Sequence, residues 1–234
     1  LPDGDPAPEA ATRGAGRPAN VVDHAWVAID WTLARAMRTA RFWWVAVGFA
    51  AGLFAWYAVQ VHQTKYLMEI GFAPATAAGA LGLVAFTRIV GQIPLGHLSD
   101  RIGREWVWTL SCAGFMATYA LLLAMSPQPT AALLYLMVAA QGVLGYGLAS
   151  VFGAIPAELF QGKHYGTIFG TLSLASIVGG AIGPWVAGAL HDRTGSYVLA
   201  FWIAIAVSAV SAGAMWLAAP RKVRAVAGRV PRGL

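Results

Sequence analysis

The chain has 234 residues, of which 58% are hydrophobic and 11% are charged, whereas soluble domains carry roughly 25% charged residues. So little polar surface cannot cover an aqueous fold of this size, and the apolar excess also excludes a disordered chain. The composition therefore predicts an integral membrane protein and excludes most classes of soluble enzyme. The single cysteine, Cys112, lies in an apolar run, so neither a disulfide framework nor a cysteine-based metal site is predicted.

The N-terminal part of the chain precedes the first apolar run and divides into two segments. Residues 1–25 begin with a stretch rich in proline, glycine and alanine, which predicts a flexible cytoplasmic linker. Residues 26–41 combine apolar side chains with three arginines, and we predict one interfacial amphipathic helix there, capped by Asp30.

Six apolar runs are long enough to cross a bilayer, which takes about 20 residues in a helix. They cover approximately residues 42–61, 76–97, 106–125, 131–155, 166–190 and 198–219. Because the links between them are short, residues 42–219 are predicted to form one all-α transmembrane bundle with no soluble domain. Residues 220–234 form a basic tail, which we expect to contact only solvent or lipid.

The distribution of basic residues predicts the orientation of the bundle. If the N-terminal segment is cytoplasmic, that side carries 13 lysines and arginines, and the other side carries only Lys65 and Arg193. Cytoplasmic flanks collect Lys and Arg, so both ends of the chain are expected on the cytoplasmic side of the inner (plasma) membrane. This orientation accounts for the net charge of +6 without a nucleic-acid partner.

A short motif occurs twice, 92 residues apart. Residues 96–103 (GHLSDRIG) match residues 188–195 (GALHDRTG) in the pattern Gly-x-Leu-x-Asp-Arg-x-Gly. The first copy ends the second span on the cytoplasmic side and the second copy ends the fifth span outside, which predicts an inverted repeat of three plus three helices. The alternative is a common helix-ending turn with a glycine terminator.

The loop formed by residues 96–105 (GHLSDRIGRE) resembles the cytoplasmic signature loop of the major facilitator superfamily. It departs from that pattern at Glu105, where a basic residue is usual. The stretches VQVHQTKYLMEIGF, AELFQGKHYGTIFG and GPWVAGALHDRTGSY resemble bacterial members of the monocarboxylate or oxalate/formate porter branch. The resemblance implies a twelve-span transporter built from two six-helix bundles. This chain would be the C-terminal half, part of a longer protein, and its missing N-terminal six-helix half would be its partner.

The resemblance also implies a role for the loop itself, as a conformational latch that stabilises the outward-open state against the opposite bundle. The residues expected to form this latch are Gly96, Asp100, Arg101, Gly103 and Arg104. The alternative is that they only fix topology and end a helix.

Arg88 is the one formally charged residue within the six predicted spans. It lies ten residues before Leu98, or about 15 Å of helical rise, and a central arginine costs on the order of 2.5–3.5 kcal/mol on insertion scales. Its counter-charge must come from the missing half, from backbone carbonyls or from a bound anion. A guanidinium matches a carboxylate in shape, and the resemblance implies that an arginine on the eighth helix binds substrate. A purely structural arginine is the alternative.

Further polar side chains are candidates to line the same site. The predicted substrate-binding set is Arg88, Tyr57, Gln60, Gln92, Gln141 and Tyr146, and Ser173 and Ser176 are weaker candidates. Each of these groups is equally able to bond a neighbouring helix. His62 and Lys65 follow the first span, where they attract an anion or are ordinary interfacial residues. Trp43, Trp44, Trp106, Trp108 and Tyr197 sit at span edges, as expected of an aromatic belt.

Glycines in the fifth span predict close helix packing and bending. Gly162, Gly166 and Gly170 recur every four residues, and Gly179, Gly180, Gly183 and Pro184 follow. Small residues allow close approach, and such a helix can slide or flex. The GVLGYG run at residues 142–147 is expected to serve packing.

The function predicted from these features is that of the C-terminal half of a secondary active transporter. It would move a small organic anion, a mono- or dicarboxylate, by alternating access. We expect no enzymatic activity, cofactor or metal, because no carboxylate lies within a predicted span and the five histidines lack a metal-ligand spacing. The alternatives are an exporter of drugs or other small molecules, which would favour a buried acid, and a non-transporting membrane scaffold.

Overall fold

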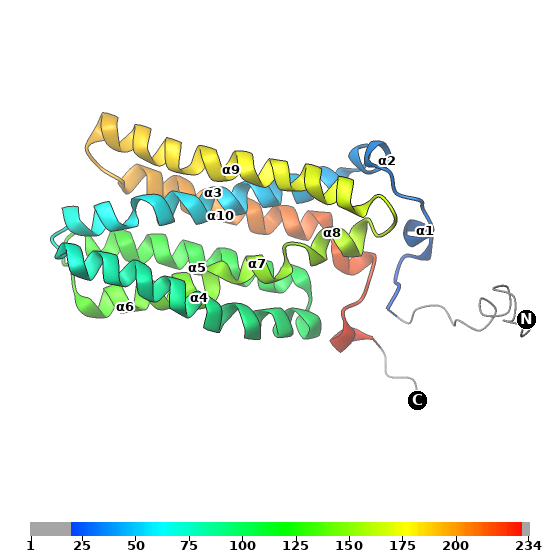
Figure 1. The fold of residues 1–234 in the computed structure, drawn as a ribbon, viewed down its shortest axis with the longest axis horizontal. Helices are drawn as coiled ribbons and strands as arrows, with labels where there is room; N and C mark the ends of the chain where they lie inside the picture. Colours follow the sequence, from blue (N-terminus) through cyan, green and yellow to red (C-terminus); the bar gives the residue numbers. More distant parts are fainter. Residues whose placement is uncertain (1–19, 231–234) are drawn as a thin grey trace, which may run out of the picture.

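The computed structural model describes residues 20–230, and six long helices run side by side through them (Figure 1). In chain order they are α3 (Ala40–Glu69), α4 (Pro74–Ile102), α5 (Arg104–Met125), a discontinuous helix, α9 (Tyr165–Thr194) and α10 (Val198–Ala218). The discontinuous helix comprises α6 (Ala131–Ala139), η2 (Ala140–Leu144), η3 (Gly145–Gly147), α7 (Leu148–Val151) and α8 (Ala154–Leu159). The prediction of an all-α protein with six spanning helices is confirmed.

The helices extend beyond most of the apolar runs that predicted them. The run at 42–61 lies within the longer α3, and the run at 76–97 lies within α4. An apolar run stops at the first polar residues, but backbone hydrogen bonds continue through them. The extensions bring carboxylates into the helix ends, which the apolar runs did not include.

Both ends of the described chain lie at one end of the bundle, which we call the termini end (Figure 1). The two copies of the repeated motif end helices at opposite ends of the bundle. Gly103 follows α4 at the termini end with φ 115°, and Gly195 follows α9 at the opposite end with φ 68°. Both glycines adopt backbone conformations that an L side chain disfavours.

The prediction of a single interfacial helix over residues 26–41 is wrong. The structure has two short helices, α1 (His24–Val27) and α2 (Leu33–Met37), followed at once by the start of α3. Their caps are Asp23 and Thr32, and Thr39 caps α3. The chain turns between α1 and α2 because Trp31 points inward, where it is 3% exposed.

Asp30, the predicted cap, instead approaches a side chain outside the N-terminal segment. Its Oδ2 lies 3.4 Å from Nζ of Lys163, and its backbone carbonyl accepts a hydrogen bond from Arg35. Trp31, its neighbour, packs edge-on against Phe160 with ring centres 5.2 Å apart. These contacts join the N-terminal segment to the end of α8.

The expectations for the linker and the tail also need correction. The backbone N–H groups of Val22 and Asp23 donate to the carbonyl of Val223, and that of Ala225 donates to Asn20. Val223 is fully buried. Residues 20–25 and the tail up to residue 230 therefore form an ordered contact, because apolar tail side chains find a place to bury. The rest of the predicted linker, 1–19, and residues 231–234 lie outside the described residues.

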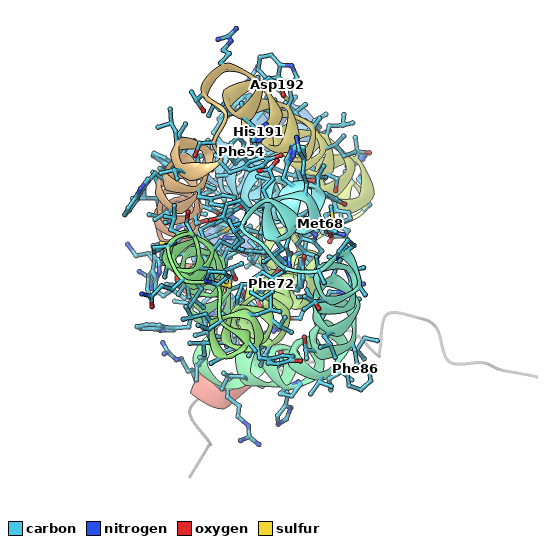
Figure 2. All side chains as sticks on the ribbon, turned by 90° about the vertical axis from the view of Figure 1, so that its left-hand side faces the viewer. Phe54, Met68, Phe72, Phe86, His191 and Asp192 are labelled. Carbon is cyan, nitrogen blue, oxygen red and sulfur yellow. The ribbon has the colours of Figure 1, made fainter. Side chains whose placement is uncertain are left out.

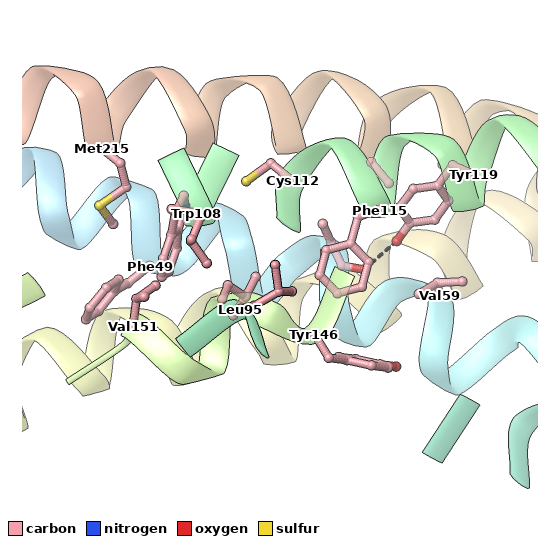
Figure 3. Packing of buried hydrophobic residues seen from close by; sticks show 14 of the residues in the cluster. Phe49, Val59, Leu95, Trp108, Cys112, Phe115, Tyr119, Tyr146, Val151 and Met215 are labelled. Atoms are coloured by element: carbon pink, nitrogen blue, oxygen red, sulfur yellow. Dashed lines mark hydrogen bonds between the residues drawn. The ribbon is translucent and has the colours of Figure 1, made fainter. Parts of the chain in front are cut away.

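The core is built from aromatic side chains contributed by α3, α5 and the discontinuous helix (Figure 3). Phe49 stacks on Trp108 with ring centres 5.4 Å apart and on Phe152 at 4.0 Å. Trp108 also donates to Ser211 on α10, which itself donates to the carbonyl of Gly48. Every polar hydrogen in this cluster therefore reaches an acceptor, as a membrane interior requires.

Two of the residues expected in an aromatic belt are instead buried. Trp108 and Tyr197 are at most 1% exposed, whereas Trp43, Trp44 and Trp106 are exposed as predicted. The position of an aromatic residue near a span edge does not determine whether its ring is exposed. The face of the helix on which the residue lies determines that.

α4 and α9 are the least covered of the spanning helices. Large apolar side chains project from them, including Phe86 and Ile93 on α4 and Trp185 on α9. Figure 2 shows Phe86 at the rim of the bundle, pointing away from the core. These faces have no protein partner within residues 20–230.

Candidate functional site

Arg88 lies midway along α4 and is half-buried. Its guanidinium carbon lies 5.6 Å from the centre of the Tyr146 ring, within the range of a cation–π contact. Its Nε is buried and has no hydrogen-bond partner among residues 20–230, and no carboxylate in that part of the chain forms an ion pair with it. The guanidinium therefore keeps unused donors beside an aromatic face.

Tyr146 lies where the fourth span is not a regular helix. The π-helix η2 and the 3-10 helix η3 replace α-helix between Ala140 and Gly147. π-helical turns inside longer helices occur frequently at functional sites. The apolar run at 131–155 gave no sign of this break, so the sequence analysis missed it.

Close packing of α4 against η2 fixes the distance between the two residues. A Cβ added to Gly91 would overlap the backbone of Val143, and one added to Gly142 would overlap the side chain of Thr87. The expectation that the GVLGYG run serves packing is confirmed. The same contact holds the middle of α4, and with it Arg88, against the break.

Two predicted glutamines donate hydrogen bonds to different atoms of Tyr146. Gln92 donates to its backbone carbonyl at 3.2 Å, and Gln141 donates to its hydroxyl at 3.1 Å. Gln141 is fully buried, and its Oε1 has no hydrogen-bond partner within the described residues. Within residues 20–230 the cluster therefore holds two buried polar atoms without a partner, the donor Nε of Arg88 and the acceptor Oε1 of Gln141.

Trp56 completes the cluster, and the sequence analysis did not select it. Its ring centre lies 4.4 Å from that of Tyr146, and its Nε1 donates to Gln60 at 2.7 Å. Tyr57 neighbours it, with ring centres 6.1 Å apart. The signal was present in the sequence, because Trp56 lies four residues before Gln60 and so shares its helix face.

Two open hollows adjoin this cluster. A hollow of about 220 Å³ is lined by Leu53, Trp56, Leu148, Ala149 and Phe152. A second, of about 480 Å³, is lined by Leu53, Tyr57, Phe152, Ser176, Ile177, Gly180 and Ala181. Both have mainly apolar walls. The structure thus gathers Arg88, Gln92 and Gln141 around Tyr146, with Trp56 and its partner Gln60 beside them, and places Tyr57 at the second hollow instead.

The glycines of the fifth span divide into two groups. Gly179 and Gly183 pack directly on the backbone of α3, so that added Cβ atoms would overlap Ala50 and Phe54. Gly162, Gly166 and Gly170 face open space, with no atom within 4 Å of an added Cβ. The expected close approach is therefore found only in the second half of α9. Ser173 and Ser176 both donate to carbonyls of their own helix.

His62 and Lys65 lie at the opposite end of the bundle and are engaged there with neighbouring groups. His62 bonds the hydroxyl of Tyr197 at 3.1 Å and the carbonyl of Pro184 at 2.9 Å. Lys65 lies 3.7 Å from Glu69, which also approaches His191. Figure 2 shows His191 and Asp192 on α9 at this end. Burial, together with the nearby carboxylates of Glu69 and Asp192, raises the pKa of Tyr197 to about 12.

The signature loop at the termini end is centred on Arg104. This side chain lies 2.7 Å from Asp100 and 2.9 Å from Glu158 on α8, and it also donates to Ser99. The network joins the turn between α4 and α5 to the end of the discontinuous helix. Glu158 was missed because the predicted fourth span ended at residue 155.

The remaining latch candidates have separate surroundings. Gly103 makes the turn, and Gly96 leaves 3.5 Å between an added Cβ and Ser150. Arg101 is exposed and forms no ion pair among residues 20–230, but its backbone lies under Gly228 of the tail. Glu105, which departs from the family pattern, is 2% exposed. It accepts from the backbone N–H of Arg221 at 2.9 Å.

No group of three or more His, Cys, Asp or Glu side chains within residues 20–230 is arranged to hold a metal ion. The arrangement around Tyr146 combines a cationic donor, amide groups and aromatic faces.

Comparisons with known proteins agree with this architecture. Residues 47–233 match the model of the Major Facilitator Superfamily. The chain is 27% identical over 161 residues to monocarboxylate transporter 13 of Bos taurus, covering 66% of this chain and 36% of the relative. It is 25% identical over 191 residues to monocarboxylate transporter 10 of Danio rerio, covering 80% of this chain and 37% of the relative.

A third relative is described by a different substrate. The triacylglyceride transporter of Mycobacteroides abscessus is 26% identical over 163 residues, covering 66% of this chain and 30% of that protein. The chain thus spans about a third of the length of these curated relatives. Because the family match covers most of the chain, including all six spanning helices in whole or in part, the chain belongs to the major facilitator superfamily and resembles its monocarboxylate transporters.

Proposed function

We propose that the chain is the C-terminal half of a secondary active transporter that moves a small organic anion, a mono- or dicarboxylate, by alternating access. The observation that carries this proposal is Arg88, a guanidinium in the middle of a membrane span with unused donors and no carboxylate partner among residues 20–230. An intramembrane arginine is expected to mark a substrate pathway.

The surroundings of Arg88 favour an organic carboxylate over an inorganic anion. A guanidinium presents paired donors to the two oxygens of a carboxylate. The aromatic faces of Trp56 and Tyr146 and the two apolar-walled hollows can cover a non-polar substrate body. Relatives named monocarboxylate transporters support the same substrate class.

Alternating access requires a second bundle, which we place in an N-terminal half outside this chain. The relatives are about three times as long as the stretch that matches them. The exposed apolar faces of α4 and α9 would pack on that half or on lipid. The distribution of 13 basic residues against two supports a cytoplasmic termini end in the plasma membrane. The network around Arg104 would then act as the cytoplasmic latch.

The proposal is tested by uptake into proteoliposomes made with the full transporter, using radiolabelled monocarboxylates and dicarboxylates. Removing one partner of a buried charged contact costs about 2–5 kcal/mol, so Arg88→Gln should weaken carboxylate uptake by about thirtyfold or more. Arg88→Lys should recover part of it, because the charge remains but the planar fork is lost.

The matched control is Arg193→Gln, which removes an exposed positive charge on α9 outside the cluster. Its uptake should equal that of the wild type. Undiminished carboxylate uptake by Arg88→Gln, or transport of uncharged compounds but no carboxylate, would contradict the anion assignment.

A further inference from the structure

A basic hollow lies at the termini end, between the turn that joins α4 to α5 and the C-terminal tail. Its volume is about 450 Å³. The charged side chains that line it are Arg221, Lys222, Arg224 and Arg229 of the tail, with Glu105 and Glu158 of the bundle. Figure 1 shows the tail, with η4 (Pro220–Lys222) and η5 (Ala227–Arg229), at this end of the molecule.

Both carboxylates of the hollow already have cationic partners. Glu105 accepts from the backbone N–H and the guanidinium of Arg221, at 2.9 and 3.4 Å. Glu158 pairs with Arg104, whose guanidinium approaches from outside the hollow's lining. Three further cations, Lys222, Arg224 and Arg229, form no ion pair with any of the residues 20–230. Counting only these described residues, the hollow therefore carries an uncompensated positive charge.

Arg224 gives this charge a fixed donor. Its Nε is buried and has no acceptor among the described residues. Its backbone is held by a β-bridge to Val21, and the next residue bonds Asn20. A buried donor without an acceptor is costly, and the tail cannot easily move to relieve it. An anion that entered the hollow would supply the missing acceptor.

We propose that this hollow binds a phosphate group, presented by an anionic lipid headgroup or by inorganic phosphate. Three cations that have no ion-pair partner among residues 20–230 line one hollow, and a phosphate offers more acceptor oxygens than the two of a carboxylate. Arginine donors match its geometry. Basic pockets at the ends of membrane helices are suited to lipid phosphates. This site is separate from the Arg88 cluster and does not depend on what the transporter carries.

Binding there would stabilise the termini end. The tail that lines the hollow also packs on the signature loop, because an added Cβ on Gly228 would lie 2.6 Å from Cα of Arg101. A phosphate held between Arg224 and Arg229 would keep the tail in this position. The bound protein should therefore unfold at a higher temperature than the free protein.

The test measures binding to the purified full transporter in a neutral detergent. The probes are inorganic phosphate, phosphatidylglycerol and, as a lipid without net charge, phosphatidylcholine. Bound lipid is counted by native mass spectrometry, and thermal unfolding is followed across a titration of each probe. Wild type should bind phosphatidylglycerol or inorganic phosphate, with a raised unfolding temperature, and bind phosphatidylcholine more weakly.

The variants are Arg224→Gln and Arg229→Gln. Each basic residue near a membrane surface contributes about 1 kcal/mol to the attraction of anionic lipid, so each variant should bind roughly fivefold more weakly. Arg229 is exposed, so its substitution keeps the test valid even if Arg224→Gln does not fold. The matched control is Arg38→Gln, an exposed arginine of the N-terminal segment that does not line the hollow.

The probes distinguish the two sources of phosphate. Variant-sensitive binding of phosphatidylglycerol alone supports a lipid headgroup, and variant-sensitive binding of inorganic phosphate supports the free ion. Absence of both, or equal losses in Arg38→Gln and in the two variants, would overturn the proposal.

Discussion

Glu105 accepts a hydrogen bond from the backbone N–H of Arg221 at 2.9 Å, across 116 residues of sequence. The carboxylate is 2% exposed, and the contact joins the start of α5 to η4, just after the end of α10. At this position the signature loop of the family usually has a basic residue. Here the acidic side chain attaches the tail to the loop.

The first prediction concerns this contact. Glu105→Ala should lower the free energy of unfolding by about 1.5–3 kcal/mol, because the substitution removes the charged acceptor of a hydrogen bond. Glu105→Gln keeps an acceptor for the Arg221 N–H and should lose less. Thermal unfolding in detergent measures both. Equal stability of Glu105→Ala and the wild type would show that the contact is dispensable.

The spans and the arginine could be predicted because each depends on local composition. Twenty apolar residues in a row must become a helix in a membrane, and Arg88 was conspicuous as the one charge among them. The glutamines and tyrosines were predicted as site residues for the same reason, because they are polar side chains within apolar spans. The Tyr146 cluster gathers five of the six residues chosen from the sequence, although their role in binding stays a prediction.

The missed features depend on contacts between distant residues. The break at 140–147 has the same apolar composition as a regular helix, and only its packing against α4 makes it visible. Glu158 reaches Arg104 across 54 residues, and tail residue Val223 finds its partners near residue 22. The pattern of apolar and polar residues along the chain does not indicate such distant pairs. The short helices near Trp31 were missed because one buried aromatic side chain redirected the chain.

A second prediction compares two glycines. Gly91→Ala should destabilise the bundle by about 1–3 kcal/mol, the usual cost of overpacking, because its Cβ would overlap the backbone of Val143. Gly166→Ala is the control, since nothing lies within 4 Å of its added Cβ and alanine favours a helix by up to about 1 kcal/mol. Unfolding of the isolated chain in detergent measures both. Comparable stabilities of the two variants would contradict the close packing of α4 on the break.

A third prediction concerns the latch in the full transporter. Asp100→Asn should change the rate of substrate exchange several-fold while altering stability by less than about 1 kcal/mol, because a half-exposed ion pair contributes little to folding. The repeat provides the matched control, Asp192→Asn, at the equivalent position of the other copy and at the opposite end of the bundle. Exchange assays with preloaded proteoliposomes measure the rates. If Asp100→Asn exchanges at the wild-type rate, the loop only ends a helix.

A fourth prediction follows from the raised pKa of Tyr197, which lies in the turn before α10. In the unfolded chain its hydroxyl ionises near pH 10, whereas in the folded protein the pKa is about 12. Between pH 10 and pH 12 the folded state therefore retains the proton, whereas the unfolded state releases it. The contribution of this hydroxyl to stability is present below pH 10 and is lost as the pH rises from 10 to 12. Tyr197→Phe should be less stable at neutral pH, because His62 loses its hydroxyl partner, but its stability should fall less steeply above pH 10. Thermal unfolding between pH 7 and pH 12 gives both slopes.

Tyr135, an exposed tyrosine on α6, is the control, and Tyr135→Phe should retain the wild-type slope. Identical slopes for wild type and Tyr197→Phe would mean that the buried hydroxyl does not couple folding to protonation.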